Sequence, residues 1–384
     1  MTWQKSLVAI RSLLGEEYVV SLDPGIVVIN WNFGKRCNYD CSYCSPAVHD
    51  WISPHHSLTD IKNFVTNLDR WISSQGKTFK VSLTGGEPMV HPEIIEVLQI
   101  IRSASSCNEK LVLVTNGSVP LEKYKQALEY VTHLTVSLHL ERSDQEIQDI
   151  LDKIVTINRL YPNGPNRSLN VQVMCLPGKF DFIENTVIPL FSKNQVRFTL
   201  RRIRPWLNET VDEWQDTDRR QILKKIYTLE EKKNMKLAER NDLDQRLGQV
   251  YESGNYYSFK ELEWLATHVP ETHWQNIGVW FDDLSYTETN SDLMASNGKN
   301  SFNGWTCWAG LDTLAVEFDG TIYRGMCKND GPIGHLGSHI EFPKTTTVCK
   351  RNWCTGNPDQ CTRKAHPNFV HLVNNHPVLE ENGK

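Results

Sequence analysis

The sequence lacks the features of a membrane-spanning protein and of a protein that coats nucleic acid. No stretch reaches the roughly 18 unbroken apolar residues that a spanning helix needs. The formal net charge of −5 supports neither bulk binding to nucleic acid nor binding to an anionic membrane. The N-terminal segment carries scattered charges and lacks the apolar core of a signal peptide. We therefore expect a cytoplasmic protein without a membrane or bulk nucleic-acid partner.

Internal repeats and low-complexity tracts are also absent, so we expect ordinary globular domains. From about residue 25 to residue 205, apolar runs of strand length alternate with helical patterns, as the βα units of a parallel sheet do. The expected strands are IVVINWNF, KVSLTGGE, LVLVTNG, LTVSLHLE, LNVQVMC and VRFTLRR. The expected helices lie at about 58–71, 93–101, 121–130 and 145–160.

These strands are polar on one face and apolar on the other. Because side chains alternate along a strand, Ser137, His139 and Glu141 share one face of the fourth expected strand, and Arg201 lies on the polar face of the sixth. An ordinary eight-stranded α/β barrel fills its centre with branched apolar side chains. We therefore expect a partial, TIM-like barrel of six βα units whose interior holds polar ligands. A sheet with one wetted face is the open alternative.

The rest of the chain differs from this region in composition. A charged, helical stretch and a loop-rich segment follow the expected barrel, and a further region contains half of the cysteines. The expected segments are an N-terminal extension, the barrel, a helical and loop connector, a cysteine-containing domain and a tail, at 1–24, 25–205, 206–300, 301–366 and 367–384.

Ten cysteines in an expected cytoplasmic chain favour metal binding or catalysis over disulfides. Three of them fall within Cys37–Cys44 and five within Cys307–Cys361, whereas Cys107 and Cys175 are isolated. Scattered core cysteines would not be grouped in this way. By strand parity Cys175 lies on the apolar face of its strand, so we expect it to pack in the core. We assign no role to Cys107.

The first group places Cys37, Cys41 and Cys44 at spacings of three and two residues, directly after the first expected strand. Three thiolates on one tight loop can hold three irons of a [4Fe–4S] cluster and leave the fourth iron open. A zinc site would normally take a fourth protein ligand, which His49 could supply, and this alternative stays open.

The segment Thr84-Gly85-Gly86-Glu87-Pro88 follows at the end of the second expected strand. With the cysteine motif before it, the region of residues 25–205 resembles the radical S-adenosylmethionine (radical SAM) superfamily. The resemblance implies S-adenosylmethionine as cofactor, with the glycine–glycine–glutamate segment at its methionine amino group. Glycine suits a segment that a ligand approaches closely. The implied cofactor contacts are Tyr43 near the adenine, Gly85, Gly86 and Glu87, Asn116 of a Thr-Asn-Gly segment, Ser137 at the ribose, and Arg201.

The resemblance also implies the chemistry. The open iron of the cluster binds the cofactor, and reductive cleavage of the cofactor yields a 5′-deoxyadenosyl radical that abstracts a hydrogen atom from the substrate. A reductase such as flavodoxin or ferredoxin is the implied electron donor. We expect His139 and Glu141 to contact the substrate, and Arg201 to pair with a carboxylate of the cofactor or substrate. For Arg201 a structural ion pair is the alternative.

The second group begins with Cys307, Gly320 and Cys327, spaced C-x12-G-x6-C. The alternation LAVEF-DG-TIYRG between the cysteines predicts a β-hairpin with its turn at Asp319-Gly320. Because a hairpin brings its two ends together, Cys307 and Cys327 can bind one metal centre. Cys349, Cys354 and Cys361 then follow as C-x4-C-x6-C.

This pattern resembles the SPASM and twitch domains that carry auxiliary iron–sulfur clusters in many radical SAM enzymes. It departs from them in two ways. It has five cysteines rather than seven, and six residues rather than four separate the glycine from the next cysteine. We assign one auxiliary [4Fe–4S] cluster, with Cys361 as the spare cysteine and a structural zinc site as the alternative. The expected ligands are Cys307, Cys327, Cys349 and Cys354.

The substrate is less constrained than the cofactors. We expect oxidative modification of a peptide, with the auxiliary cluster as electron acceptor. The alternative is dehydrogenation, epimerisation or rearrangement of a small molecule, sugar or nucleotide.

Overall fold

The structure is a computed structural model, and the residues described are 18–21, 25–44, 48–107, 110–203, 257–268, 276–281, 286–290, 294, 299–354 and 357–369. The charged stretch expected to be helical lies within residues 204–256 and is outside the described residues, as is most of the C-terminal tail.

The six expected strands form a parallel sheet in which each strand pairs with the next along the chain. They are β2 (Ile26–Asn32), β3 (Thr78–Thr84), β4 (Leu111–Thr115), β5 (His133–Leu138), β6 (Ser168–Cys175) and β7 (Phe198–Arg202). This arrangement confirms the predicted α/β class and the order of the strands.

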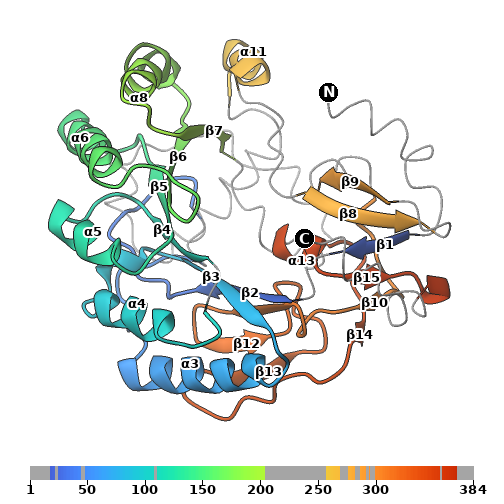
Figure 1. Cartoon of the computed structure of the whole chain (residues 1–384). Coiled ribbons are helices and arrows are strands. Elements are labelled where there is room, and N and C mark those ends of the chain that lie inside the picture. The colour runs from blue at the N-terminus through green and yellow to red at the C-terminus, as the bar shows by residue number, and fades with distance from the viewer. Residues whose placement is uncertain are drawn as a thin grey trace.

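Helices connect these strands and line one side of the sheet (Figure 1). Those predicted from sequence are α3 (Leu58–Ser73), α4 (Ile94–Arg102), α5 (Leu121–Ala127) and α6 (Asp144–Leu160). After β6 come α7 (Phe180–Phe182), a π-helical turn η2 (Ile183–Val187) and α8 (Ile188–Lys193). Helix α6 begins with a capping box, in which Ser143 and Glu146 satisfy each other's backbone N–H groups.

The two faces of the sheet differ as the strand parity predicts. In β6 the face of Leu169, Val171, Val173 and Cys175 is buried in the core, while the alternate residues are half-buried. We call the half-buried side of β2–β7, which none of the described helices covers (Figure 1), the helix-free face. Burial of Cys175 confirms that this cysteine packs in the core.

The predicted hairpin is present as β11 (Thr313–Val316) and β12 (Thr321–Tyr323), paired antiparallel. Gly320 in its turn has φ +88°, a left-handed conformation that favours glycine. Strand β11 also pairs in parallel with β2, and β13 (Pro332–His335) pairs with β12. The hairpin therefore extends the barrel strands into one nine-stranded sheet, ordered β13-β12-β11-β2-β3-β4-β5-β6-β7.

A second, antiparallel sheet joins segments from the two ends of the chain. Strand β1, from the expected N-terminal extension, lies between a C-terminal strand and β8. The sheet order is β14 (Thr347–Val348), β10 (Thr306–Cys307), β15 (Lys364–Ala365), β1 (Tyr18–Ser21), β8 (Asn276–Phe281) and β9 (Tyr286–Asn290). The remaining elements are η1 (Pro88–Val90), α11 (Phe259–His268), α13 (Asn357–Cys361) and η5 (Pro367–Phe369).

A buried carboxylate joins the barrel to the C-terminal region. Asp312, fully buried just before β11, accepts two hydrogen bonds from the Arg363 guanidinium, at 2.7 and 2.8 Å. Lys77, just before β3, lies 3.5 Å from the same carboxylate and donates to the carbonyl of Leu311 at 2.9 Å. The backbone carbonyl of Asp312 accepts from Val28 of β2. These contacts couple the two regions mechanically.

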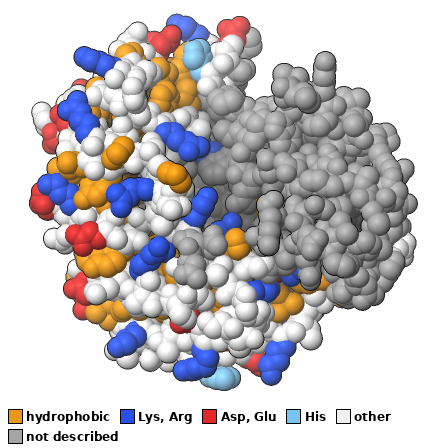
Figure 2. Space-filling model, in the orientation of Figure 1, with side chains coloured by type: hydrophobic (Ala, Val, Ile, Leu, Met, Phe, Trp, Pro, Cys, Tyr) orange, Lys and Arg blue, Asp and Glu red, His pale blue; other side chains and the backbone are white. Residues whose placement is uncertain are grey.

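On the face shown in Figure 2, Lys and Arg side chains are scattered among Asp, Glu and apolar side chains over the described part. None of the described helices is long and apolar enough to cross a bilayer.

Candidate functional site

The first cysteine group lies on the loop that follows β2. The N–H of Cys37 donates to the carbonyl of Asp50 at 2.8 Å, and the N–H of Cys44 donates to that of Cys41 at 3.1 Å. Burial raises the pKa of the Cys37 thiol to about 12. Burial, and then the charges of Glu141, Cys44 and Cys37, raise the pKa of Cys41 well above its ordinary value. Because burial raises the pKa of these two thiols, they need a cation to be held as thiolates, which is what a metal centre supplies.

Gly86 and Glu87 pair with the beginning of this loop. The N–H of Gly86 donates to the carbonyl of Gly34, and the N–H of Glu87 to that of Arg36, both at 2.8 Å. A Cβ on Gly86 would lie 2.4 Å from the carbonyl oxygens of Lys35 and Arg36. Glycine is therefore required at position 86 by the close approach of the protein's own backbone.

Gly85 is required for two reasons. Its φ is +121°, and a Cβ there would lie 2.8 Å from the carbonyl oxygen of Gly34. The sequence predicted that the glycines allow a ligand to approach. The contact between these glycines and a ligand stays a prediction. What the structure shows is that both glycines pack closely against the backbone of the cysteine loop.

The Glu87 carboxylate is buried, with 3% of the residue exposed, and links the ends of two strands. It accepts hydrogen bonds from the N–H of Met89 at 2.9 Å, the hydroxyl of Thr115 at 2.8 Å and the N–H of Asn116. Burial raises the pKa of Glu87 to about 7, against the lowering effect of these donors.

The side chain of Asn116 contacts the cysteine loop. Its amide nitrogen donates to the side-chain oxygen of Asn38 at 2.9 Å and lies 3.9 Å from Sγ of Cys37. The amide oxygen of Asn116 accepts from the N–H of Ser118 at 3.0 Å. Asn116 therefore holds the loop at its first cysteine, while its predicted cofactor contact is untested.

His139 contacts the same loop from the end of β5. Its Nδ1 lies 3.4 Å from Sγ of Cys41 and 2.6 Å from the hydroxyl of Tyr43. The rings of Tyr43 and His139 are stacked, with centroids 5.9 Å apart, and Tyr43 is buried. Burial lowers the pKa of His139 to about 4, so its ring is neutral near pH 7.

Glu141 supports the middle of the loop. Its carboxylate accepts a 2.7 Å hydrogen bond from the N–H of Ser42 and a second, short one from the Ser42 hydroxyl. His139 and Glu141 were predicted to contact the substrate. The structure gives both of them partners on the cysteine loop, a contact between residues about a hundred positions apart that strand parity cannot reveal.

The other residues proposed from the sequence lie on or near the helix-free face. Ser137 is half-buried opposite Gln172, and Arg201 is half-buried opposite Met174. Their cofactor contacts stay predictions. His49, the possible zinc ligand, has its Nε2 3.4 Å from a carboxylate oxygen of Asp40.

Cysteines of the second group line one small cavity. Its described lining includes the four cysteines proposed as cluster ligands, Cys307, Cys327, Cys349 and Cys354. Cys361 is buried in the same apolar cluster, with 3% exposed, but is not among the described lining residues. Within the described ranges, no three His, Cys, Asp or Glu side chains are gathered at the spacing of a single metal ion.

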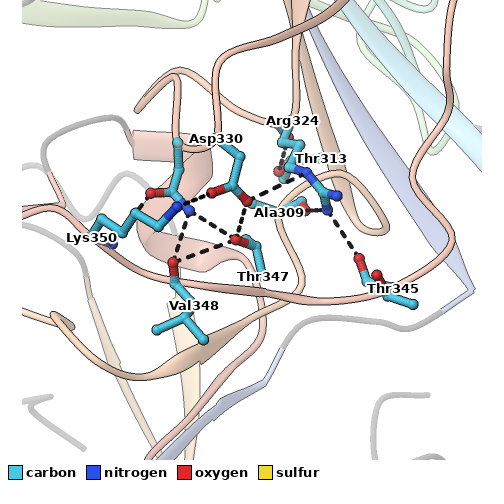
Figure 3. A network of polar contacts seen from close by, with 9 residues as sticks. Ala309, Thr313, Arg324, Asp330, Thr345, Thr347, Val348 and Lys350 are labelled. Carbon is cyan, nitrogen blue, oxygen red and sulfur yellow. Dashed lines mark hydrogen bonds and ion pairs between the residues drawn. The ribbon is translucent and has the colours of Figure 1, made fainter.

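A polar network joins the segment after the hairpin to the segment around β14 (Figure 3). Asp330, three residues after Cys327, lies 2.6 Å from Nζ of Lys350 and accepts a hydrogen bond from the Thr347 hydroxyl. Arg324 donates to the carbonyl of Thr345 at 3.0 Å and lies 3.8 Å from Asp330. The network thus connects the end of the hairpin to β14, and Cys349 is the residue directly after β14.

Sequence reasoning missed two buried charged residues at this cavity. Asp359 accepts hydrogen bonds from the N–H groups of Met326, at 3.0 Å, and Cys327, at 2.6 Å. Lys364 also lines the cavity, and only 1% of it is exposed. Burial alone would lower the pKa of Lys364, but the charges of Cys354, Cys307 and other groups outweigh it and raise the pKa. Lys364 stands between Arg363 and Ala365 in a polar segment, so the sequence contains no sign of its burial.

Comparison with known proteins identifies the first cysteine region. Residues 31–161 match the family model described as the Radical SAM superfamily. The GTP 3′,8-cyclase of Microcystis aeruginosa is 34% identical over 124 residues, which are 31% of this chain and 35% of that protein. An S-adenosylmethionine-dependent nucleotide dehydratase from Fibrobacter sp. is 21% identical over 179 residues, 41% of this chain and 50% of that protein. The matches thus span half or less of these curated relatives.

Two solved structures align along most of the chain at low identity. SuiB of Streptococcus suis bound to S-adenosylmethionine has a TM-score of 0.44 and 13% identity, covering 83% of this chain and 66% of SuiB. The protein anSMEcpe with bound AdoMet has a TM-score of 0.44 and 14% identity, covering 82% of this chain and 79% of the other.

The matched residues 31–161 contain the three loop cysteines, the glycine–glycine–glutamate segment that pairs with the loop, and the strand ends that support it. Residues 31–161 therefore form a radical SAM domain, the family in which a [4Fe–4S] cluster acts on S-adenosylmethionine.

Proposed function

We propose that this radical SAM enzyme oxidises a polar substrate by two electrons and that a second, auxiliary [4Fe–4S] cluster accepts one of them. The observation that carries the proposal is the convergence of Cys307, Cys327, Cys349 and Cys354 on one cavity. A redox-neutral rearrangement needs no second cluster, whereas an oxidation has to pass an electron on.

The first cysteine loop fits a cluster with an open iron. Cys37, Cys41 and Cys44 are the donors, and soft thiolates suit iron–sulfur clusters. When bound, the reduced cluster and S-adenosylmethionine supply a 5′-deoxyadenosyl radical that abstracts a hydrogen atom from the substrate. Glu141, His139 and Asn116 hold the loop that carries the thiolates.

The second cysteine group fits a cluster better than a single zinc ion. A tetrahedral zinc site draws four sulfurs to about 2.3 Å from one ion. In the described part of the chain, cysteines do not gather at such spacing, although four of them line one cavity. A [4Fe–4S] cluster is larger and keeps its four thiolates farther apart, which supports the auxiliary cluster.

The helix-free face offers groups that would bind a polar, anionic substrate. Ser82 and Gln172 are half-buried there and can form neutral hydrogen bonds. Lys80 and Arg201 are half-buried on the same face, where cations suit a phosphate or carboxylate. The two curated relatives are named for reactions of GTP and of nucleotides. We therefore propose a nucleotide-like substrate, and the peptide expected from the sequence becomes the other outcome of the test.

The electrons and atoms of this reaction balance. The substrate loses one hydrogen atom, which ends in 5′-deoxyadenosine, and then one electron and one proton. The electron passes to the auxiliary cluster and from there to a one-electron carrier of the flavodoxin or ferredoxin class, while the proton passes to water.

Metal analysis and product stoichiometry test the proposal together. Anaerobically reconstituted enzyme is expected to bind about eight irons per chain, as two [4Fe–4S] clusters. Four irons with one zinc would remove the auxiliary cluster from the proposal and leave the radical chemistry in place.

A panel of nucleotides, and peptides encoded beside the gene, would then be screened for 5′-deoxyadenosine formation above the background without substrate. Oxidation predicts one 5′-deoxyadenosine per product, a product lighter by two hydrogens, and deuterium from labelled substrate in 5′-deoxyadenosine. A product of unchanged mass that carries a solvent hydrogen would mean epimerase or isomerase chemistry instead.

A further inference from the structure

Lys364 is a buried lysine that forms no ion pair with a carboxylate among the described residues, although the charge of Asp359 at the same cavity is one of those that raise its pKa. Its ammonium group donates hydrogen bonds to the backbone carbonyls of Asp359, Gln360 and Thr362, the last two at 3.3 and 2.9 Å. The carboxylate of Asp359 is occupied instead by the N–H groups of two hairpin residues. A charge removed from water is costly unless an opposite charge compensates it, and carbonyl dipoles compensate it only in part.

The sheet places this lysine beside the second cysteine group. In the pairing of β15 with β10, Lys364 lies directly opposite Cys307. Side chains at paired positions of neighbouring strands lie on the same face and within contact of each other. Lys364 and Cys307 accordingly line the same cavity, together with Cys354.

The position of the ammonium group is fixed from more than one direction. The carbonyls of Asp359 and Gln360 belong to α13, and that of Thr362 belongs to the short segment that joins α13 to β15. Nζ also lies 4.9 Å from the ring centroid of Phe302, a cation–π contact. A charge held in this way cannot swing into solvent, so it acts on the cavity permanently.

We propose that Lys364 is the built-in counter-charge of the anionic centre that the second cysteine group holds, and that it raises the reduction potential of that centre. This inference rests on the proposed auxiliary cluster. A [4Fe–4S] cluster with four thiolate ligands is net negative in both oxidation states, and reduction adds one more negative charge. A fixed cation in a low-dielectric interior favours the more negative, reduced state.

The effect suits the proposed role of the cluster. A centre that accepts an electron from a substrate radical works better when its reduced state is stabilised. Lys364 thus acts through its charge on the cluster and does not contact the substrate.

The test measures the midpoint potential of the auxiliary cluster by a redox titration followed by electron paramagnetic resonance. The background is the full chain with Cys37, Cys41 and Cys44 replaced by alanine, so that the signal comes from the auxiliary cluster alone. In this background Lys364→Met is expected to make the cluster roughly tenfold harder to reduce, which is a shift of 59 mV to lower potential for one electron. Lys364→Arg keeps the charge and is expected to restore most of the potential.

Lys344→Met is the matched control, because it removes the same charge from an exposed position. Its potential is expected to equal that of the background protein. A Lys364→Met protein that binds four irons at an unchanged potential would overturn the proposal. Iron lost from Lys364→Met but kept by Lys364→Arg would support the need for a charge, whereas iron lost from both would overturn it and indicate a packing role.

Iron content separates this failure from failure of the proposed function. If the background protein binds zinc in place of four irons, the auxiliary cluster is wrong, and no signal will titrate in any variant. If it binds four irons, only the effect of Lys364 on the potential is in question.

Discussion

The carboxylate of Glu141 accepts a 2.7 Å hydrogen bond from the backbone N–H of Ser42, which stands between two cysteines of the first group. The Ser42 hydroxyl donates to the same carboxylate. One acidic side chain beyond β5 thus holds two donors of a loop that begins after β2. This contact holds the loop at Ser42, whereas Gly86 and Glu87 hold its beginning.

Glu141→Ala is expected to loosen this loop. Hydrogen bonds to a charged acceptor contribute about 1.5–3 kcal/mol, so the midpoint of unfolding should fall, and iron should be lost from the first cysteine group. Differential scanning calorimetry and iron analysis, in parallel with the control Glu129→Ala at an exposed position in the turn after α5, measure both effects. If Glu141→Ala keeps its iron and cleaves the cofactor without substrate, but forms no product, Glu141 contacts the substrate as the sequence predicted.

Gly86→Ala is expected to destabilise the protein strongly. The new Cβ would lie 2.4 Å from two backbone oxygens, neither of which can rotate away as the end of a side chain could. We expect a loss of about 3 kcal/mol in the free energy of unfolding, the upper part of the range for overpacking. Gly164→Ala is the matched control, since a Cβ there meets nothing within 4 Å. Equal denaturant midpoints for the two variants would contradict the conclusion that position 86 requires glycine.

The sequence was sufficient for the strands and helices of the barrel because each one repeats a local pattern. Alternation in β6 placed Cys175 in the core, and the Asp319-Gly320 turn located the hairpin. The hairpin also predicted that Cys307 and Cys327 lie close together, and both line one cavity. Such features depend on neighbours a few positions away.

What the sequence could not predict depends on contacts between distant segments. The pairing of β11 with β2 requires two strands almost 290 positions apart to be adjacent, and neither strand's pattern specifies its neighbour. The partners of His139 and Glu141 on the cysteine loop are hidden for the same reason. Lys364 is a stronger case, because a lysine beside an arginine predicts a solvent-exposed position rather than one opposite Cys307.

Asp312→Asn is expected to weaken the connection between the barrel and the C-terminal region. It leaves the guanidinium of Arg363 half-buried without its bidentate partner and also removes the attraction to Lys77. Breaking a buried pair on one side typically costs about 3–5 kcal/mol. Equilibrium denaturation, monitored by fluorescence, should show this loss.

The control for Asp312 is Glu122→Gln, which breaks an exposed ion pair with Lys125. Exposed pairs contribute about 0–1 kcal/mol, so the two variants should differ clearly. A loss below 1 kcal/mol for Asp312→Asn would mean that this carboxylate does not hold the two regions together.

The two cysteine groups are expected to respond differently to replacement. With Cys37, Cys41 and Cys44 changed to alanine, the enzyme should form no 5′-deoxyadenosine under dithionite, while about four irons remain at the second group.

Cys361→Ala should keep about eight irons and full cofactor cleavage, because Cys361 is not among the described lining of the auxiliary cavity. Cys354→Ala is the matched comparison within the second group and should lose the auxiliary irons alone. Cofactor cleavage by the triple variant would show that the first group is not the catalytic centre. Loss of the auxiliary irons from Cys361→Ala would mean that Cys361 is a ligand. One of the four assigned cysteines would then not be a ligand, since a [4Fe–4S] cluster takes no more than four.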